Sequence, residues 1–442
     1  MSRAGSNTAV AHTRNQRRET AATFPAGIIL FNIKYSPNLG DGVIAECLEH
    51  ELGREFPNAT ITSVDLAGRA SWAPPRNARV RLAQLALLQR LPRPLNDLVV
   101  TARLCWLLVT DLRSRWRRAL AKADVVVFGG GQLIQDGDLN FPLKLAAVAR
   151  ECRRRGAPFA IFAVGAGPSR SRFGRCLFRY VLQAPKLLHV AARDRQSEDE
   201  LRRLGSSHVV SCRDPGLLAS HLWPAQPRFR RSRLRIGLGV THGTLLLHHA
   251  DGDDHSTPAE STALFSILTV SLLDAGFEVT CYSNGAGEDV LALEELRGRL
   301  SRMGALAQVS VAPRCETPSQ LARLISGFDA VVSHRLHACI LAYSYKIPHL
   351  GFVWDAKIRH FFDSVRRSRF VIPFNAATVP SVGSLLASAL DEGIDEAIHA
   401  QTLLDTQDSI RRLASSLAGV MEANGSAVLS GTDFDEKDVG CR

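Results

Sequence analysis

The sequence predicts an α/β protein made of two doubly wound, Rossmann-like domains that face each other across a cleft. Short apolar runs alternate with longer segments of helical periodicity, which is typical of βαβ units and parallel sheets. The alternation stops at residues 221–233, where two prolines and several arginines occur, and it restarts at Leu234. Ligands of such open sheets bind beyond the C-terminal ends of the strands, so we expect the site between the domains.

The first domain is expected over residues 25–222. Apolar, largely β-branched runs predict its strands at 26–33, 61–66, 124–128, 159–164, 189–192 and 209–211. Helices are expected at 42–56, at 79–120 with a break near Pro92, and directly before Leu204. Residues 1–24 carry arginines without an apolar stretch behind them, so they predict a disordered leader and not a secretory signal.

The second domain is expected over residues 234–375. The same pattern predicts strands at 234–240, 277–282, 330–332 and 349–353, and helices at 263–275, 289–300, 319–325 and 336–345. A helical tail is expected over 376–420, followed by a disordered end over 421–442.

The amino-acid composition excludes several classes of protein and indicates which kind of partner the chain binds. Of 442 residues, 45% are hydrophobic and 22% are charged, which is ordinary for a soluble globular protein. The formal net charge of +11 favours an acidic partner. Nine scattered cysteines without a CxxC pair predict neither a disulfide framework nor a zinc site, and they suit a reducing compartment. No apolar run reaches the length of a membrane span, and no nucleic-acid-binding motif is present.

Two glycine-rich loops follow predicted strands. In the first, Asn38 to Gly42, glycines allow close backbone approach and the next helix offers its N-terminus to an anion, while Asp41 either faces a ligand or caps that helix. In the second, residues 129–138, three glycines precede Asp136 and Asp138. These carboxylates either take a proton from a hydroxyl or belong to a solvated turn. Neither a dinucleotide fingerprint nor a P-loop is present.

The third polar loop, residues 333–338, places His334, Arg335 and His337 in the first turn of a helix. Cations are disfavoured there by the helix dipole, which suggests that an anion binds between them and the helix N-terminus. A histidine in this place suits proton donation near neutral pH; the alternative is a partly buried histidine bonded to backbone. Side chains at i and i+2 do not share a helix face, so Arg335 and His337 converge only at an irregular turn.

Further polar groups lie near predicted strand ends or in charged stretches. Arg193 ends a strand, Ser197 suits a helix cap, and Lys357 follows a turn. The basic region 95–122 is either a membrane-surface helix or a solvated face. The loop 248–255, rich in His and Asp, lacks zinc spacing and is either a metal site or a polar loop.

Taken together, these loops resemble the polysaccharide pyruvyl transferase family. The matching segments extend over about residues 27–365 and are Asn38-Leu39-Gly40-Asp41, Gly129-Gly130-Gly131 with Asp136, Arg193-Asp194 with Ser197, Asp214-Pro215, Phe328 to Ala338, and Gly351 to Lys357. The resemblance implies a GT-B-like fold. It also implies transfer of the pyruvyl group of phosphoenolpyruvate onto two hydroxyls of a sugar in an exopolysaccharide or cell-surface glycan, with release of phosphate. Phosphoenolpyruvate is then a co-substrate, and neither a cofactor nor a metal is expected.

The resemblance and the chemistry of phosphoenolpyruvate together assign the expected site. His337 is expected as general acid and Asp136 as general base. The substrate-binding residues are expected to be Asn38, Asp41, Gly130, Gly131, Arg193, Ser197, Arg335 and Lys357. The expected acceptor is a sugar, free or in a lipid-linked oligosaccharide reached through the basic region, which puts the protein in the cytoplasm or at the inner face of the membrane.

Two other functions fit the same fold. One is a nucleotide-sugar glycosyltransferase of GT-B type, which would bind a nucleoside diphosphate. The other is a non-catalytic glycan-binding protein, which would bind a glycan without turnover.

Overall fold

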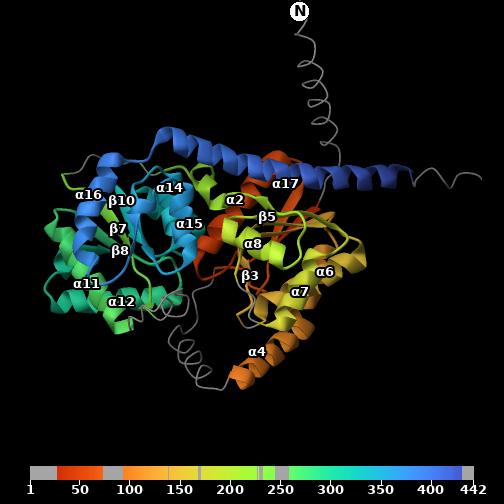
Figure 1. Cartoon of the computed structure of the whole chain (residues 1–442), viewed down its shortest axis with the longest axis horizontal. Helices are drawn as coiled ribbons and strands as arrows, with labels where there is room; N and C mark the ends of the chain where they lie inside the picture. The colour runs from red at the N-terminus through yellow and green to blue at the C-terminus, as the bar shows by residue number, and fades with distance from the viewer. Residues whose placement is uncertain are drawn as a thin grey trace, which may run out of the picture.

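The computed structural model describes residues 27–72, 93–137, 139–167, 171–225, 227, 232–243 and 258–430, and it contains two six-stranded parallel sheets with helices on both faces (Figure 1). The predicted fold class of two doubly wound domains is therefore confirmed. The expected leader, the loop 248–255 and Asp138 lie outside the described residues.

The first sheet has the strand order β2-β1-β3-β4-β5-β6. Its strands are β1 (Gly27–Asn32), β2 (Thr60–Asp65), β3 (Val125–Ile134), β4 (Phe159–Ala166), β5 (Leu187–Ala192) and β6 (Val210–Ser211). The central strand β1 is apolar on both faces: Ile28 and Leu30 pack on one side, and Ile29 and Phe31 on the other. This double burial is typical of a strand inside a parallel sheet.

Strand β3 is longer than the sequence predicts. The three glycines do not end it at Phe128, because Gly129 and Gly131 continue to pair with β4, and the register shifts only between Gly131 and Ile134. Gly130 and Gly131 have φ of 74° and 78°, a left-handed conformation that favours glycine. The extra strand length moves the residues that follow away from the sheet edge.

The helices of the first domain are α2 (Leu39–Glu55), α4 (Arg93–Leu107), a π-helical turn (Leu108–Leu112), α5 (Arg113–Leu120), α6 (Asn140–Arg155), α7 (Arg172–Leu182) and α8 (Arg195–Arg203). Leu112, Trp116 and Leu120 of the π-helical turn and α5 pack under the sheet with α6 and α7, two helices that the sequence does not predict. A short turn, Pro215–Leu218, and α9 (Ala219–Leu222) close the domain.

The second sheet has the order β12-β11-β10-β7-β8-β9. Its strands are β7 (Arg235–Gly239), β8 (Glu278–Tyr282), β9 (Val309–Val311), β10 (Ala330–Ser333), β11 (His349–Val353) and β12 (Val371–Pro373). The outer strands β9 and β12 have three residues each, too short for the sequence pattern to show. The helices are α11 (Pro258–Asp274), α12 (Gly287–Arg302), α13 (Pro318–Ser326), α14 (Leu336–Ser344), α15 (Ala356–Ser364) and α16 (Val382–Glu392).

The last helix, α17 (Glu396–Ser430), spans both domains and forms the long upper edge of the molecule in Figure 1. Its first turns contact the second domain, where the rings of Tyr343 and His399 lie 5.2 Å apart in a tilted arrangement. Farther along, Leu413 and Leu417 pack on Ile28 and Leu30 of the first sheet. The helix continues past the expected end at residue 420, where Met421 still packs against the same cluster.

None of the helices in the described part of the chain has both the length and the hydropathy that crossing a membrane requires. The eight cysteines in the same part are all free.

Candidate functional site

A cavity of about 120 Å³ lies between the two domains, at the C-terminal ends of strands from both sheets. Its lining combines polar loops of both domains: Asn38, Asp41, Gly131, Gln132, Arg193, Asn284, Arg335, Leu336, His337, Trp354, Asp355 and Lys357. The three polar loops chosen from the sequence therefore meet at one place.

The N-terminus of α2 joins the two domains at the cavity. The Asn38 side chain accepts hydrogen bonds from the Gly40 backbone at 3.4 Å and from the Asn284 side chain at 3.0 Å. A Cβ on Gly40 would lie 2.6 Å from Cβ, Cγ and Nδ1 of His337, so only glycine leaves room for this imidazole. Asp41 lies beside them and is partly buried, and this desolvation raises its pKa more than the charge of His337 and a hydrogen bond from Ser36 lower it.

His337, Asp214 and Arg193 form a charged group that links the domains. The Nε2 atom of His337 lies 3.6 Å from Oδ2 of Asp214, and Nη1 of Arg193 donates to the same oxygen at 3.2 Å. Burial alone would raise the pKa of Asp214, but His337 and Arg193 outweigh it and lower this pKa to about 2. Asp214 is therefore ionised at neutral pH and lies next to the imidazole of His337.

Arg335 is held by a residue of the helix that follows a different strand of the second sheet. Its Nε and Nη2 each donate to the Asp289 carboxylate at 2.9 Å, and Asp289 lies in the first turn of α12. Arg335 itself is the N-cap of α14, with extended backbone (φ −77°, ψ 114°). Because this residue lies outside the helix, both it and His337 line the cavity although they are two residues apart.

The remaining cation, Lys357, lies at the start of α15. Its Nζ is 3.0 Å from Oδ2 of Asp355, which also caps the helix by accepting from the backbone of Lys357 and Ile358. The Trp354 indole donates to the carbonyl of His334 at 2.8 Å and so fixes this turn against the loop of Arg335.

Three expected site residues do not line the cavity. Asp136 is buried near the N-terminus of α7, where its two carboxylate oxygens accept from Ser171 and from the Leu139 backbone, and it does not line the cavity. Gly130 faces α2, because a Cβ there would lie 2.3 Å from Ile44. The buried Ser197 hydroxyl accepts from the Ala166 backbone and supports the end of β4.

Five polar residues of the site were not chosen from the sequence: Gln132, Asp214, Asn284, Asp289 and Asp355. Gln132 directly follows the three glycines and accepts from Arg193 at 3.3 Å. Asn284 belongs to the glycine-containing turn after β8, and Asp289 to the first turn of the helix that follows it, so both obey the same strand-end rule as the other loops. In the part of the chain described here, no group of three His, Cys, Asp or Glu residues is arranged to hold a metal ion.

Comparison with known proteins gives one family match and several similar folds. A model of the polysaccharide pyruvyl transferase family matches residues 38–356. A structure described as "putative UDP-N-acetylglucosamine 2-epimerase from Listeria monocytogenes" is 10% identical, with a TM-score of 0.51, and the match covers 90% of this chain and 98% of that one. A UDP-glucosyltransferase from Polygonum tinctorium is 11% identical over 89% of this chain and 99% of its own, with a TM-score of 0.48. No curated protein matches by sequence.

Proposed function

Because this chain belongs to the polysaccharide pyruvyl transferase family, we propose that it transfers the pyruvyl group of phosphoenolpyruvate to two hydroxyls of a sugar and releases phosphate. The product is a cyclic ketal on an exopolysaccharide or cell-surface glycan. The observation that carries this proposal is the inter-domain cavity in which His337, Arg335, Arg193 and Lys357 come together.

The cations of the cavity support binding of a small molecule with a phosphate and a carboxylate. Each is already oriented by an acid: Arg335 by Asp289, Arg193 by Asp214 and Lys357 by Asp355. The Arg335 pair uses Nε and Nη2, and among the described residues Nη1 has no hydrogen-bond partner. Guanidinium groups bind phosphate and carboxylate through several N–H donors, so a held arginine can accept a second anion.

His337 is the proposed general acid. Its proton goes to the methylene carbon of phosphoenolpyruvate, which becomes the methyl group and leaves C2 electrophilic. The first sugar hydroxyl then forms a C–O bond to C2. The bond between C2 and the phosphate ester oxygen breaks, phosphate leaves with that oxygen, and the second hydroxyl forms a C–O bond to C2. The two hydroxyls lose two protons in all; one replaces the proton given by His337 and the other leaves with phosphate. These steps need proton transfers and neither a metal nor a redox cofactor.

Two carboxylates support this chemistry in different ways. Asp214 is ionised and 3.6 Å from Nε2 of His337, so it is placed to orient the imidazole for proton transfer. Asp41 lines the cavity and its pKa is raised by burial, so its carboxylate is a better base than a solvated one. We assign the removal of the first hydroxyl proton to Asp41, in place of the Asp136 expected from the sequence.

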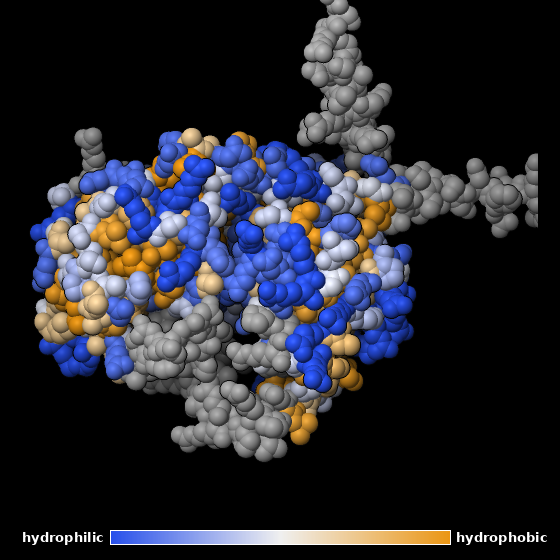
Figure 2. All heavy atoms as spheres, in the orientation of Figure 1, coloured by the Kyte–Doolittle hydropathy of each residue, from blue (hydrophilic) through white to orange (hydrophobic). Residues whose placement is uncertain are grey.

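A projecting helix supports a lipid-linked acceptor at the inner face of the membrane. Helix α4 and the π-helical turn that follows it expose an apolar stripe of Leu98, Ala102, Cys105, Trp106 and Val109, with Trp106 63% and Val109 71% exposed. Exposed arginines lie on α5 and α7 of the same domain, namely Arg115, Arg117, Arg118, Arg172, Arg175 and Arg179. In Figure 2, apolar atoms at the end of α4 lie next to strongly hydrophilic surface. An apolar stripe beside basic groups suits an anionic membrane surface.

The proposal is tested by assaying phosphate release from phosphoenolpyruvate with a panel of sugar acceptors, followed by product analysis for pyruvate ketals. We expect acceptor-dependent phosphate release, reduced about 100-fold or more in His337→Ala. Protection against thermal unfolding by a nucleoside diphosphate, and not by phosphoenolpyruvate, would indicate a glycosyltransferase. Glycan binding without turnover, unchanged in Arg335→Ala, would indicate a non-catalytic binding protein.

A further inference from the structure

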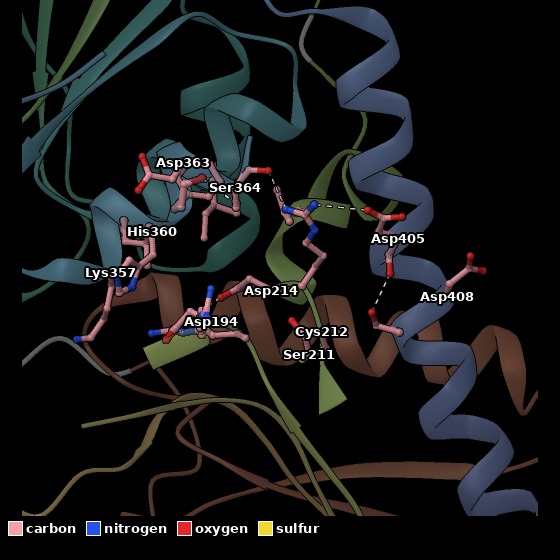
Figure 3. Close-up of a pocket in the computed structure, with 18 of the residues that line it drawn as sticks. Asp194, Ser211, Cys212, Asp214, Lys357, His360, Asp363, Ser364, Asp405 and Asp408 are labelled. Carbon is pink, nitrogen blue, oxygen red and sulfur yellow. Dashed lines mark hydrogen bonds and ion pairs between the residues drawn. The ribbon is translucent and has the colours of Figure 1, made fainter. Parts of the chain in front are cut away.

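A second and larger cavity, of about 590 Å³, adjoins the site and extends from it to α17 (Figure 3). The two cavities share Arg193, Leu336 and Lys357. Asp214, which lies 3.6 Å from the imidazole of His337, also lines the larger cavity. A ligand in this space can therefore reach the reacting end of the smaller cavity.

The lining of the larger cavity suits a neutral ligand that is rich in hydroxyls. Five cationic and five acidic side chains line it: Arg193, Arg195, Arg213, Arg412 and Lys357 against Asp194, Asp214, Asp363, Asp405 and Asp408. Several are already paired; Arg213, for example, donates to the Ser364 carbonyl at 3.1 Å and to Asp405 at 3.4 Å. A nucleoside diphosphate would require an excess of cations, whereas sugar hydroxyls bond to acids and arginines alike.

Apolar side chains lie among these polar groups. Leu217, Leu336, Ile340 and Phe361 contribute to the wall between the domains. Sugar rings have apolar C–H faces beside their hydroxyls, so a wall of this mixed kind fits them. The volume is within the roughly 300–1,000 Å³ range of small-molecule sites, and it is several times that of the smaller cavity.

Much of this wall lies outside the family match. The match ends at residue 356, while α15 contributes Lys357 to Ser364 and α17 contributes Asp405, Asp408, Ser409 and Arg412. Figure 3 shows Asp405 and Asp408 on α17, across the cavity from His360 and Lys357. The residues of the proposed chemistry, by contrast, lie almost all within the match.

We propose that the larger cavity binds the acceptor oligosaccharide, with the sugar that receives pyruvate beside His337 and further sugar units extending toward α17. The side chains of α17 then select the glycan, while the smaller cavity holds the donor. This inference rests on the proposed function, because it assigns the second substrate of the same reaction.

The test compares Asp408→Asn and Arg412→Gln with a matched control, Asp391→Asn. Asp408 and Arg412 line the cavity and are exposed, so their replacement is compatible with folding; Asp391 is an exposed residue of α16 outside the lining. The probes are oligosaccharides of one to four sugar units, prepared by mild acid hydrolysis and depyruvylation of the surface polysaccharide of the source organism. KM is measured by phosphate release, and binding without donor is measured by titration calorimetry.

We expect about a five- to tenfold rise in KM and Kd for the longer oligosaccharides in both cavity variants. The KM for phosphoenolpyruvate and the KM for a single sugar unit are expected to stay unchanged. Equal values in the cavity variants and the control would overturn the inference while leaving the proposed function intact. If no phosphate is released, but calorimetry shows oligosaccharide binding that the cavity variants lose, the assignment of the cavity stands and the proposed reaction fails.

Discussion

Gly40 and His337 belong to different domains, yet the imidazole occupies the space where a Gly40 side chain would be. A Cβ on Gly40 would lie 2.6 Å from three atoms of His337, closer than real side-chain contacts. Gly40 is thus part of the wall that positions His337, the proposed general acid.

Replacing Gly40 with alanine is expected to lower kcat about 100-fold, because the imidazole must move by roughly an ångström from its position beside Asp214. Gly53→Ala in the same helix is the matched control. A Cβ there meets only Ile61, at 4.0 Å, so this variant is expected to keep full activity and to be slightly more stable. Equal activity of the two variants would contradict the placement of His337.

Variants of Asp41 and Asp136 distinguish which of the two carboxylates is the general base. Asp136→Ala is expected to keep kcat and to lose about 1–3 kcal/mol of the free energy of unfolding, because buried donors of Ser171 and Leu139 lose their acceptor. Asp41→Asn is expected to lower kcat about 100-fold, since the base is removed. Kinetics and urea unfolding of both variants provide the check. A large loss of kcat in folded Asp136→Ala would restore Asp136 as the base.

The strand-end rule explains why much of the site can be predicted from the sequence. The loops of Asn38, Arg193 and Arg335 follow parallel strands, and each lines the cavity. The strand-end rule wrongly places Asp136 at the cavity, because β3 continues through the glycines. This extension carries the residues after Gln132 away from the sheet edge. This extension depends on pairing with β4, and the local sequence does not encode it.

The partners of the site residues could not be predicted in the same way. Arg335 follows β10 and Asp289 lies in the helix after β8. They meet because the strand order puts only β7 between these two strands, whereas Asn284 meets Asn38 because the two domains dock. Asp214 stands in a recognisable Asp-Pro pair, but its contact with His337 again depends on docking. Fold class follows from local periodicity, whereas these contacts follow from strand order and from the arrangement of the domains.

His334 is expected to lower the stability of the folded protein as the pH falls below 6.5. Burial among Phe265, Phe352 and Phe374 lowers its pKa to about 3, below the ordinary value of 6.5. Between these values the unfolded chain binds a proton that the folded protein does not, so the free energy of unfolding falls by about 1.4 kcal/mol for each pH unit below 6.5.

His334→Phe is expected to have a shallower slope of unfolding free energy between pH 6.5 and 5, whatever its stability at pH 7. Urea unfolding at three pH values measures this slope. His208→Phe, at an exposed histidine, serves as the control and is expected to keep the wild-type slope. Equal slopes for the wild type and His334→Phe would contradict burial of a neutral His334.

Trp106 is expected to report contact with membranes. Vesicles containing phosphatidylglycerol should shift the emission of its exposed indole to shorter wavelength, and the shift should be absent in Trp106→Phe. Val109→Glu is expected to lower vesicle affinity about tenfold, and salt should weaken binding by screening the arginines. Leu234→Glu, at an exposed leucine of the second domain, is the control. Vesicle binding by Val109→Glu equal to that of Leu234→Glu would argue against this surface.

The path of α17 also bears on how the chain folds during its synthesis. One face of the first sheet, around Ile28, Leu30, Val125 and Val127, is covered in part by Leu413 and Leu417. The strands of this sheet are translated well before the helix that completes their cover. A chain that ends before Glu396 therefore exposes apolar side chains on one face of the first sheet, and we expect it to aggregate.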